Sequence, residues 1–433
     1  MSFRRQSSHG WWVLWAFWAL WAGSAQAAEP APVLEDDFVE KLFQRWPQKF
    51  HPAVDDLEGH RVQVLITEVE RVKGRLKKGQ SRYRVVRHGF RVDAEYFYPA
   101  SAVKTLAAVA TMRRLRRDRT LKRAKITLDT PLAVHRLFVD QPELESTDET
   151  HLANGRITLG HEIKKMSIVS DNRAFDRLYG FAGQDRIDAL VQRVGLEKTR
   201  IFHRLSRRRT VEENRWSEPL DFHVDGDFET PPTVQQKVRV SPGTLQPLPE
   251  TLKGIQVGQG HMVGGELVET PMSFTYKNRM GLVDLQNMLM KIVRPDLKVP
   301  GKGFGLRKAD RAFLKETMRM RPGESTDPLL PEETYDPLRF KPVLGGLSRF
   351  APVEDWTVWN KAGKAYGFRI ENAYFEHPKR GRRKALFITV ALYTNANGVL
   401  NDDEYEYDTV ADPFIHDLTE AAVRTLWGLR PKR

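Results

Sequence analysis

The segment PASAVKTLAAVATMRRLRRDRTL, residues 99–121, has a helical pattern in which alanine and leucine precede a basic end. Pro99 can open this helix, so that Ser101 and Lys104 lie one turn apart on the same face. A hydroxyl is a poor nucleophile until a nearby base takes its proton, and a desolvated lysine can be that base because burial lowers its pKa. The helix N-terminus adds backbone N–H donors where an oxyanion would form. The segment therefore makes Ser101 a candidate nucleophile and Lys104 a candidate base.

Two shorter motifs complement this pair. Ser-Asp-Asn at residues 170–172 falls between short helical patterns and offers a second hydroxyl for proton transfer and an amide for a substrate amide. Lys-Ala-Gly at residues 361–363 follows a strand pattern, and its ammonium group can attract a substrate carboxylate. Gly363 would let a substrate lie against the strand edge. As alternatives, these residues could be a helix cap and a surface lysine, but three motifs in order are more specific than one.

The periodicity of the chain predicts one mixed α and β domain. With 433 residues and 40% apolar side chains, the chain is long enough for a large core. Strand patterns occupy both ends and helical patterns lie between them, so distant segments must complete one sheet. Strands are expected at 61–69, 82–92, 356–360, 367–376 and 385–394, and helices at 34–46, 99–121, 280–292, 309–320 and 415–427, with two or three short helices in 159–205.

The N-terminus predicts export. Arg4 and Arg5 precede an apolar stretch at residues 11–22, and Ala-Gln-Ala at residues 25–27 is a small-x-small cleavage signal. We expect a signal peptide cut after Ala27, a periplasmic or secreted chain, and no stable membrane span after cleavage; retention of the stretch as an anchor is the alternative. The expected organisation is a signal peptide (1–27), a linker and N-terminal helix (28–60), and a single catalytic domain (61–433) with an insertion at about 206–275, a stretch rich in Pro, Gly, Glu and Arg.

The composition narrows the possible partners and cofactors. The net charge is +13, but the basic runs at 113–125 and 204–209 lack interleaved aromatic residues, so we interpret them as solvated faces and expect no nucleic acid. Zero cysteines exclude a disulfide framework and a thiolate metal site. We expect no metal and no cofactor, because the histidines show no metal-ligand spacing and are scattered, among them His88, His151, His161, His203 and His261.

The three motifs resemble those of the serine β-lactamases and penicillin-binding proteins, which carry S-x-x-K, S-D-N and K-T-G. The chain is most similar to class A β-lactamase-like serine hydrolases. This resemblance covers roughly residues 38–205 and 275–428 and implies an α+β fold of the β-lactamase/transpeptidase type, with an antiparallel sheet flanked by helices and an all-helical half. The agreeing neighbouring segments are ITLDTPL (126–132), SDNRAFDRLYGFAGQDRIDALVQRVGL (170–196), KAGKAYGFRIENAYFE (361–376) and ALFITVALYTN (385–395).

The resemblance implies a role for each motif residue. Ser101 would be the acylated nucleophile and Lys104 its base. The backbone N–H groups of Ser101 and Lys364, the residue after Gly363, would form the oxyanion hole. The remaining roles are a proton relay at Ser170, a contact to the substrate amide at Asn172, and attraction of the substrate carboxylate by Lys361.

Two positions depart from the family pattern. Ala362 replaces the Thr or Ser of the third motif and removes a hydroxyl that hydrogen-bonds the substrate carboxylate in the family. The glutamate that activates the deacylating water in class A enzymes is missing at the expected distance from Ser170, where Ser206 stands. Glu212 and Glu213 are the nearest acids, and Glu213 is the candidate deacylation base.

The sequence thus predicts an exported serine hydrolase that forms an acyl-enzyme on Ser101. The favoured activity is class A β-lactamase-like hydrolysis of a β-lactam or related amide. A cell-wall D,D-peptidase or esterase of the same fold is the first alternative, and the substrate would then be a peptidoglycan peptide. A non-catalytic envelope protein that binds a ligand is the second.

Overall fold

The structure is a computed structural model that describes residues 33–34, 36–75 and 81–432. The predicted signal peptide lies outside these residues. Within the described part of the chain, no helix is both long and apolar enough to cross a membrane.

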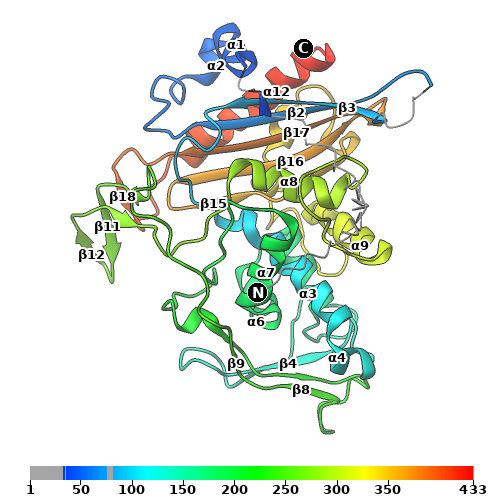
Figure 1. Cartoon of the computed structure of the whole chain (residues 1–433). Coiled ribbons are helices and arrows are strands. Elements are labelled where there is room, and N and C mark those ends of the chain that lie inside the picture. Colours follow the sequence, from blue (N-terminus) through cyan, green and yellow to red (C-terminus); the bar gives the residue numbers. More distant parts are fainter. Residues whose placement is uncertain (1–32, 35, 76–80, 433) are drawn as a thin grey trace, which may run out of the picture.

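A seven-stranded sheet forms the upper part of the molecule (Figure 1). Its order is β1-β3-β2-β17-β16-β14, and β15 also pairs with β16, so strands from both ends of the chain lie side by side. Every pair is antiparallel except β1 with β3. The strands are β1 (Val33–Leu34), β2 (Gln63–Arg71), β3 (Tyr83–Phe90), β14 (Val358–Asn360), β15 (Gly363–Ala365), β16 (Phe368–His377) and β17 (Gly381–Tyr393).

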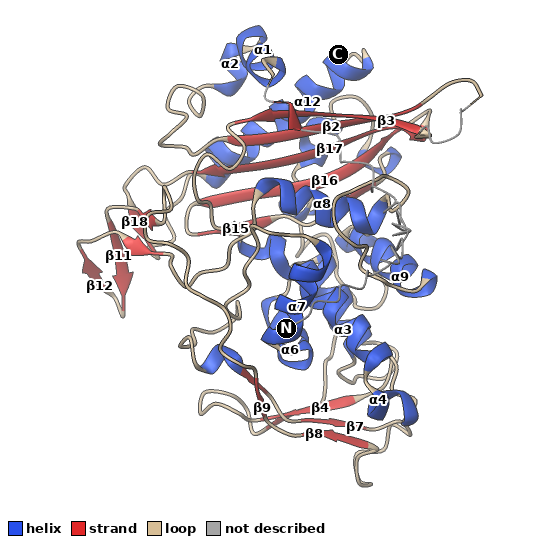
Figure 2. Ribbon diagram, in the orientation of Figure 1, coloured by secondary structure: helices blue, strands red, loops and turns tan. Residues whose placement is uncertain are grey.

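Helices cover both faces of this sheet because successive side chains point to opposite faces (Figure 2). On one face, Val64 and Ile66 join a core with α1 (Phe38–Arg45), α2 (Pro47–Phe50), α11 (Val343–Leu347) and α12 (Asp412–Trp427). On the other face, Leu65 and Val69 join a second core with α8 (Leu282–Val293). Helix α8 contacts β2, β16, β17 and α9 (Lys308–Arg319), and its central position explains why it is buried nearly all round.

The remaining helices pack below α8. The predicted helix at 99–121 is divided into a 3-10 turn, η1 (Ala100–Lys104), then α3 (Thr105–Arg117) and α4 (Arg119–Arg123). Helix α3 contacts the three short helices predicted in 159–205, which are α5 (Leu159–Ile168), α6 (Asn172–Ala182) and α7 (Gln184–Val194). The predicted α+β fold, with a helix-flanked antiparallel sheet and a helical half, is therefore confirmed. The other short helices are α10 (Pro337–Phe340), η3 (Pro322–Glu324), η4 (Val353–Asp355) and the π-helical turn η5 (Tyr407–Ala411).

Residues 206–275 contain one 3-10 turn, η2 (Glu213–Arg215), and several short strands. Two of these strands pair with strands outside the segment, β7 with β4 and β11 with β18. The four small sheets have the orders β5-β4-β7-β8, β6-β9, β10-β13 and β12-β11-β18. Their strands are β4 (Leu132–His135), β5 (Leu144–Glu145), β6 (Trp216–Ser217), β7 (Leu220–Phe222), β8 (Val234–Gln236), β9 (Arg239–Val240), β10 (Gln256–Val257), β11 (Gly260–Val263), β12 (Glu266–Val268), β13 (Met272–Ser273) and β18 (Val399–Leu400).

The interpretation of the basic runs as solvated faces is wrong for two residues. Arg113 is buried and donates to the carbonyl of Phe304. Arg204 is buried and donates to Glu218 Oε2 at 2.8 Å. A buried guanidinium needs such partners because an unpaired charge is costly to desolvate.

Candidate active site

Ser101 lies in the 3-10 turn η1, directly against strand β15. Ala100 has a φ of 45°, a left-handed conformation that is uncommon for a residue with a side chain. A Cβ on Gly363 would lie 2.5 Å from the Pro99 carbonyl oxygen and 3.2 Å from the Ala100 Cβ. Because Gly363 has no side chain, strand β15 can pack closely against the turn that carries Ser101.

Lys104, one turn later, is completely buried. Its Nζ donates to Asn172 Oδ1 at 2.6 Å, to Ser170 Oγ at 3.2 Å and to the Ser170 carbonyl oxygen. Burial lowers the pKa of Lys104 to about 7, although Asp171 and Asp176 act in the opposite direction. The ammonium form thus loses stability near neutral pH, which is the property that a general base requires.

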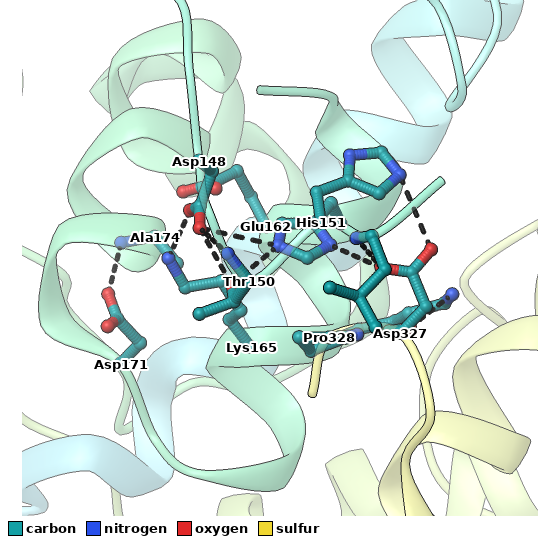
Figure 3. A network of polar contacts seen from close by, with 12 residues as sticks. Asp148, Thr150, His151, Glu162, Lys165, Asp171, Ala174, Asp327 and Pro328 are labelled. Atoms are coloured by element: carbon teal, nitrogen blue, oxygen red, sulfur yellow. Dashed lines mark hydrogen bonds and ion pairs between the residues drawn. The ribbon is translucent and has the colours of Figure 1, made fainter. Parts of the chain in front are cut away.

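Ser170 connects the first motif to the third. Ser170 lies between α5 and α6 and has a φ of 61°. The next residue, Asp171, caps α6 by accepting from the Ala174 N–H at 2.7 Å (Figure 3). Lys361 Nζ donates to Ser170 Oγ at 2.8 Å and to the Ala362 carbonyl oxygen at 3.1 Å. Burial, and then the neighbouring Lys104, lower the pKa of Lys361 well below its usual value. One hydroxyl therefore lies between two buried lysines.

The structure adds a second layer that the sequence analysis missed. Lys341 is buried, donates to Asn360 Oδ1 at 3.0 Å, and has a pKa that burial lowers to about 7. Glu371 is buried and accepts from Asn360 Nδ2 at 3.0 Å, and its pKa is raised by burial. Its charge opposes the lowering of the Lys361 pKa. The strand pattern at 367–376 does not single out Glu371, because it contains a second acid, Glu376.

Two adjoining clefts of about 630 Å³ each meet at Ser101. Both are lined by Ser101, Asn172 and Lys364. The second cleft is also lined by Ser170, Lys361, Ala362 and Gly363, so the three motifs converge there. Among the charged residues of both linings, basic side chains outnumber acidic ones, which favours an anionic substrate. They are Arg204, Arg207, Arg208, Arg209, Lys277 and Lys364 in the first cleft and Arg339, Lys361, Lys364 and Arg369 in the second.

Glu213 is not brought into either cleft. It opens the turn η2, in which Glu213 is half-buried and its carboxylate accepts from the Thr210 N–H at 2.7 Å. This hydrogen bond from the Thr210 backbone is the main cause that lowers the pKa of Glu213. Its neighbour Asn214 does line the first cleft.

The position counted from the class A pattern, Ser206, also lines the first cleft. Its hydroxyl donates to Asp176 Oδ2, and Asp176 Oδ1 accepts from the Leu205 N–H at 2.7 Å. Burial raises the pKa of Asp176, despite its hydrogen bonds with Leu205 and Ser206. Asp176 thus ties the loop at 205–206 to α6, a contact that the sequence analysis did not predict.

The comparisons agree with the predicted resemblance. The model of the beta-lactamase enzyme family matches residues 83–227, which contain Ser101, Lys104 and the motif at 170–172. This match confirms the resemblance to the serine β-lactamase and penicillin-binding protein superfamily, and the chain has the fold of a β-lactamase-like serine hydrolase. No curated protein sequence matches the chain.

Solved structures that are similar to the chain include three of this superfamily. A class A beta-lactamase from Mycobacterium abscessus is 16% identical, with 91% of this chain and 100% of that chain covered and a TM-score of 0.45. A beta-lactamase from Desulfarculus baarsii is 12% identical, with 90% and 98% covered and a TM-score of 0.45. An acyl-enzyme complex of a PBP-A mutant with penicillin G is 14% identical, with 93% and 100% covered and a TM-score of 0.48.

Proposed function

We propose that the chain is a serine hydrolase that is acylated at Ser101 by an amide or a β-lactam carrying a carboxylate. The observation that carries this proposal is Lys104, a buried lysine with a pKa of about 7, hydrogen-bonded to Ser170 and Asn172 beside the clefts that Ser101 lines. A lysine in this state can act as a base at neutral pH.

The proposed acylation sequence gives each motif residue one step. Neutral Lys104 takes the proton of the Ser101 hydroxyl, and Oγ attacks the substrate carbonyl carbon. The backbone N–H groups of Ser101 and Lys364 stabilise the oxyanion. Collapse of the tetrahedral intermediate breaks the carbon–nitrogen bond, and Ser170 passes a proton from Lys104 to the leaving nitrogen. Lys361 and the basic linings of the two clefts attract the carboxylate of the substrate.

The same site supports a long-lived acyl-enzyme. Water needs a base to hydrolyse the ester at Ser101. Among the described residues, no carboxylate lines the first cleft, which includes the loop at 204–211. Asp403 and Asp408 line the second cleft, and Asp408 lies 3.6 Å from Lys364 Nζ. This distribution favours a penicillin-reactive D,D-peptidase or esterase over rapid class A β-lactamase turnover.

The experiment is intact mass spectrometry of the protein over time with benzylpenicillin. An adduct of one penicillin per chain that persists for hours supports the peptidase, whereas one that decays within seconds supports the β-lactamase. Ser101→Ala should give no adduct, and Ser273→Ala, another serine of the first cleft, should behave like the wild type. Adduct formation by Ser101→Ala would contradict the assignment of the nucleophile. Reversible penicillin binding without any adduct would support the non-catalytic binding protein instead.

We also propose that this reaction takes place in the cell envelope or outside the cell. The support is the pattern of a charged, an apolar and a small-residue segment in residues 1–27. Mass spectrometry of the chain isolated from its native host should give an N-terminus at Ala28, and an intact N-terminus on the mature protein would contradict cleavage.

A further inference from the structure

A second polar cluster lies apart from the clefts at Ser101. It consists of His151, in the loop before α5, and Asp327, in the loop after η3 (Figure 3), together with His161, in the first turn of α5. None of the three lines either cleft. The two imidazole rings are stacked with centroids 4.3 Å apart and an interplanar angle of 8°. The prediction of scattered histidines is therefore wrong for this pair.

Both histidines direct one ring nitrogen toward the carboxylate of Asp327. His151 Nε2 lies 3.5 Å from Asp327 Oδ2, and His161 Nδ1 lies 3.7 Å from Asp327 Oδ1. These distances are longer than those of nitrogen–oxygen hydrogen bonds. One ligand atom from each of the three residues lies within 4.8 Å of the other two.

The partner of the other ring nitrogen fixes the tautomer of His151. His151 Nδ1 lies 2.6 Å from the carbonyl oxygen of Arg156. A carbonyl oxygen can only accept a hydrogen bond, so Nδ1 carries the proton. In the neutral ring, Nε2 therefore presents a lone pair to Asp327.

A hydrogen bond to a hydroxyl fixes the tautomer of His161, and again the nitrogen that faces Asp327 is the one without a proton. The Thr150 hydroxyl donates to Asp148 Oδ1 at 2.6 Å, so the oxygen of Thr150 accepts from His161 Nε2 at 3.0 Å (Figure 3). His161 Nδ1 then carries the lone pair. This atom is buried and has no hydrogen-bond partner among the described residues, and the His161 side chain is only 1% exposed.

Two lone pairs and a carboxylate that face one another repel unless a positive charge lies between them. Zinc bonds to imidazole nitrogen and carboxylate oxygen are about 2.0–2.2 Å long, so neighbouring ligand atoms of a tetrahedral zinc ion lie about 3.4 Å apart. The separations of 3.5 and 3.7 Å run to different oxygens of Asp327, so binding one ion requires the carboxylate to turn and the two stacked rings to tilt toward each other. We propose that His151 Nε2, His161 Nδ1 and the Asp327 carboxylate form a Zn²⁺ site, with a fourth position for water.

Metal-bound imidazoles usually donate their other N–H to a nearby acceptor. Both rings have such an acceptor, because His151 donates to the Arg156 carbonyl oxygen and His161 donates to the Thr150 hydroxyl. Asp327 Oδ1 also accepts from the Leu152 N–H at 3.0 Å. The ion would join the loop that carries His151, helix α5 and the loop that carries Asp327. Because α5 leads directly to Ser170, the ion would also support the loop of the second motif.

The test is zinc binding by the EDTA-treated full-length protein. Dialysis against a small excess of Zn²⁺, followed by elemental mass spectrometry, should give about one zinc per chain, and Mg²⁺ should not compete because it prefers oxygen ligands. Co²⁺ in place of Zn²⁺ should produce the visible absorption of a tetrahedral nitrogen–oxygen site. A wild-type protein that binds no zinc would overturn the proposal and leave a plain histidine–aspartate ion pair.

Variants locate the bound ion. Asp327→Asn keeps an acceptor for Leu152, and His151→Gln changes the more exposed ring, so both should fold but lose stoichiometric zinc binding. Thr150→Val removes only the hydroxyl that accepts from His161 and should weaken zinc binding about 10- to 100-fold. His135→Gln is the matched control, because His135 contacts Asp221 at 2.8 Å in an isolated pair, and it should bind zinc like the wild type. Unchanged zinc binding by Asp327→Asn and His151→Gln would also overturn the proposal.

Discussion

Lys361 Nζ lies 2.8 Å from Ser170 Oγ, although 191 residues separate the two in the chain. The same oxygen accepts from Lys104 Nζ at 3.2 Å. Two buried ammonium groups that share one acceptor disfavour each other's charged form, in addition to the effect of burial. The hydroxyl of Ser170 is therefore positioned to pass a proton on one side while it stays hydrogen-bonded on the other.

The first prediction concerns the pH dependence of acylation. The pKa of Lys104 is lowered to about 7 by burial, so its neutral, basic form increases as the pH rises through 7. The rate of adduct formation with benzylpenicillin should rise about tenfold per pH unit below this value and level off above it. Lys104→Ala should lower the rate by about 10² to 10⁴ and remove this pH dependence.

Lys341 is the matched control for this experiment, because burial lowers its pKa to about 7 as well. Lys341→Met should keep the rise in acylation rate through pH 7. If Lys341→Met removes the rise and Lys104→Ala keeps it, the base has been assigned to the wrong lysine.

The second prediction concerns the contact between β15 and the turn of Ser101. Gly363→Ala would place a methyl group 2.5 Å from the Pro99 carbonyl oxygen, so backbone must shift. We expect a loss of about 1–3 kcal/mol in the free energy of unfolding and a slower acylation by benzylpenicillin. Denaturant unfolding measures the first and intact mass the second. Gly303→Ala, where a Cβ would meet nothing within 4 Å, should change neither.

The third prediction concerns the missing hydroxyl of the third motif. Ala362 lines the second cleft beside Lys361. Ala362→Thr should add a hydrogen bond to a charged carboxylate, worth about 1.5–3 kcal/mol, and raise the acylation rate by about 10- to 100-fold. Ala362→Val has nearly the same shape without the hydroxyl and should not accelerate the reaction. Equal rates for the two variants would refute the role of the hydroxyl.

The fourth prediction concerns Glu213. Its carboxylate caps the turn at Thr210 and lines neither cleft, so Glu213→Gln should leave the lifetime of the acyl-enzyme unchanged. Decay of the adduct in intact mass spectra measures this lifetime. An adduct that persists much longer in Glu213→Gln than in the wild type would restore Glu213 as the deacylation base.

The sequence predicted those strands whose pattern of apolar residues matches their burial in the folded sheet. The alternation in residues 61–69 and 385–394 predicts strands, and β2 and β17 lie side by side in the centre of the sheet. The motif residues are also together because each motif lies at the end of a regular element. The helix at 99–121 differs because residues 100–104 form a 3-10 turn and because Asp118, in an extended conformation, separates α3 from α4.

The contacts that the sequence analysis missed depend on loops that no periodic pattern describes. Asp327 reaches His151 and His161 from a loop more than 160 residues away. Lys341 and Glu371 look like ordinary surface charges in the sequence, and only their burial around Asn360 makes them part of the site. Glu213 lines neither cleft, and its carboxylate and backbone N–H are instead hydrogen-bonded to Thr210 in a local turn that counting residues along the chain does not predict.

The pairing of β2 with β17 joins residues 63–71 to residues 381–393. A nascent chain that ends before residue 381 contains Ser101, Lys104 and β2, but it lacks β17, the strand that pairs with β2 in the centre of the sheet. Contacts of such long range form late, because much of the chain must be ordered first. A penicillin that reacts only at the assembled site would therefore mark finished molecules and ignore incomplete ones. The rate at which newly made chains become able to react with penicillin would then measure how fast the central strand pair forms.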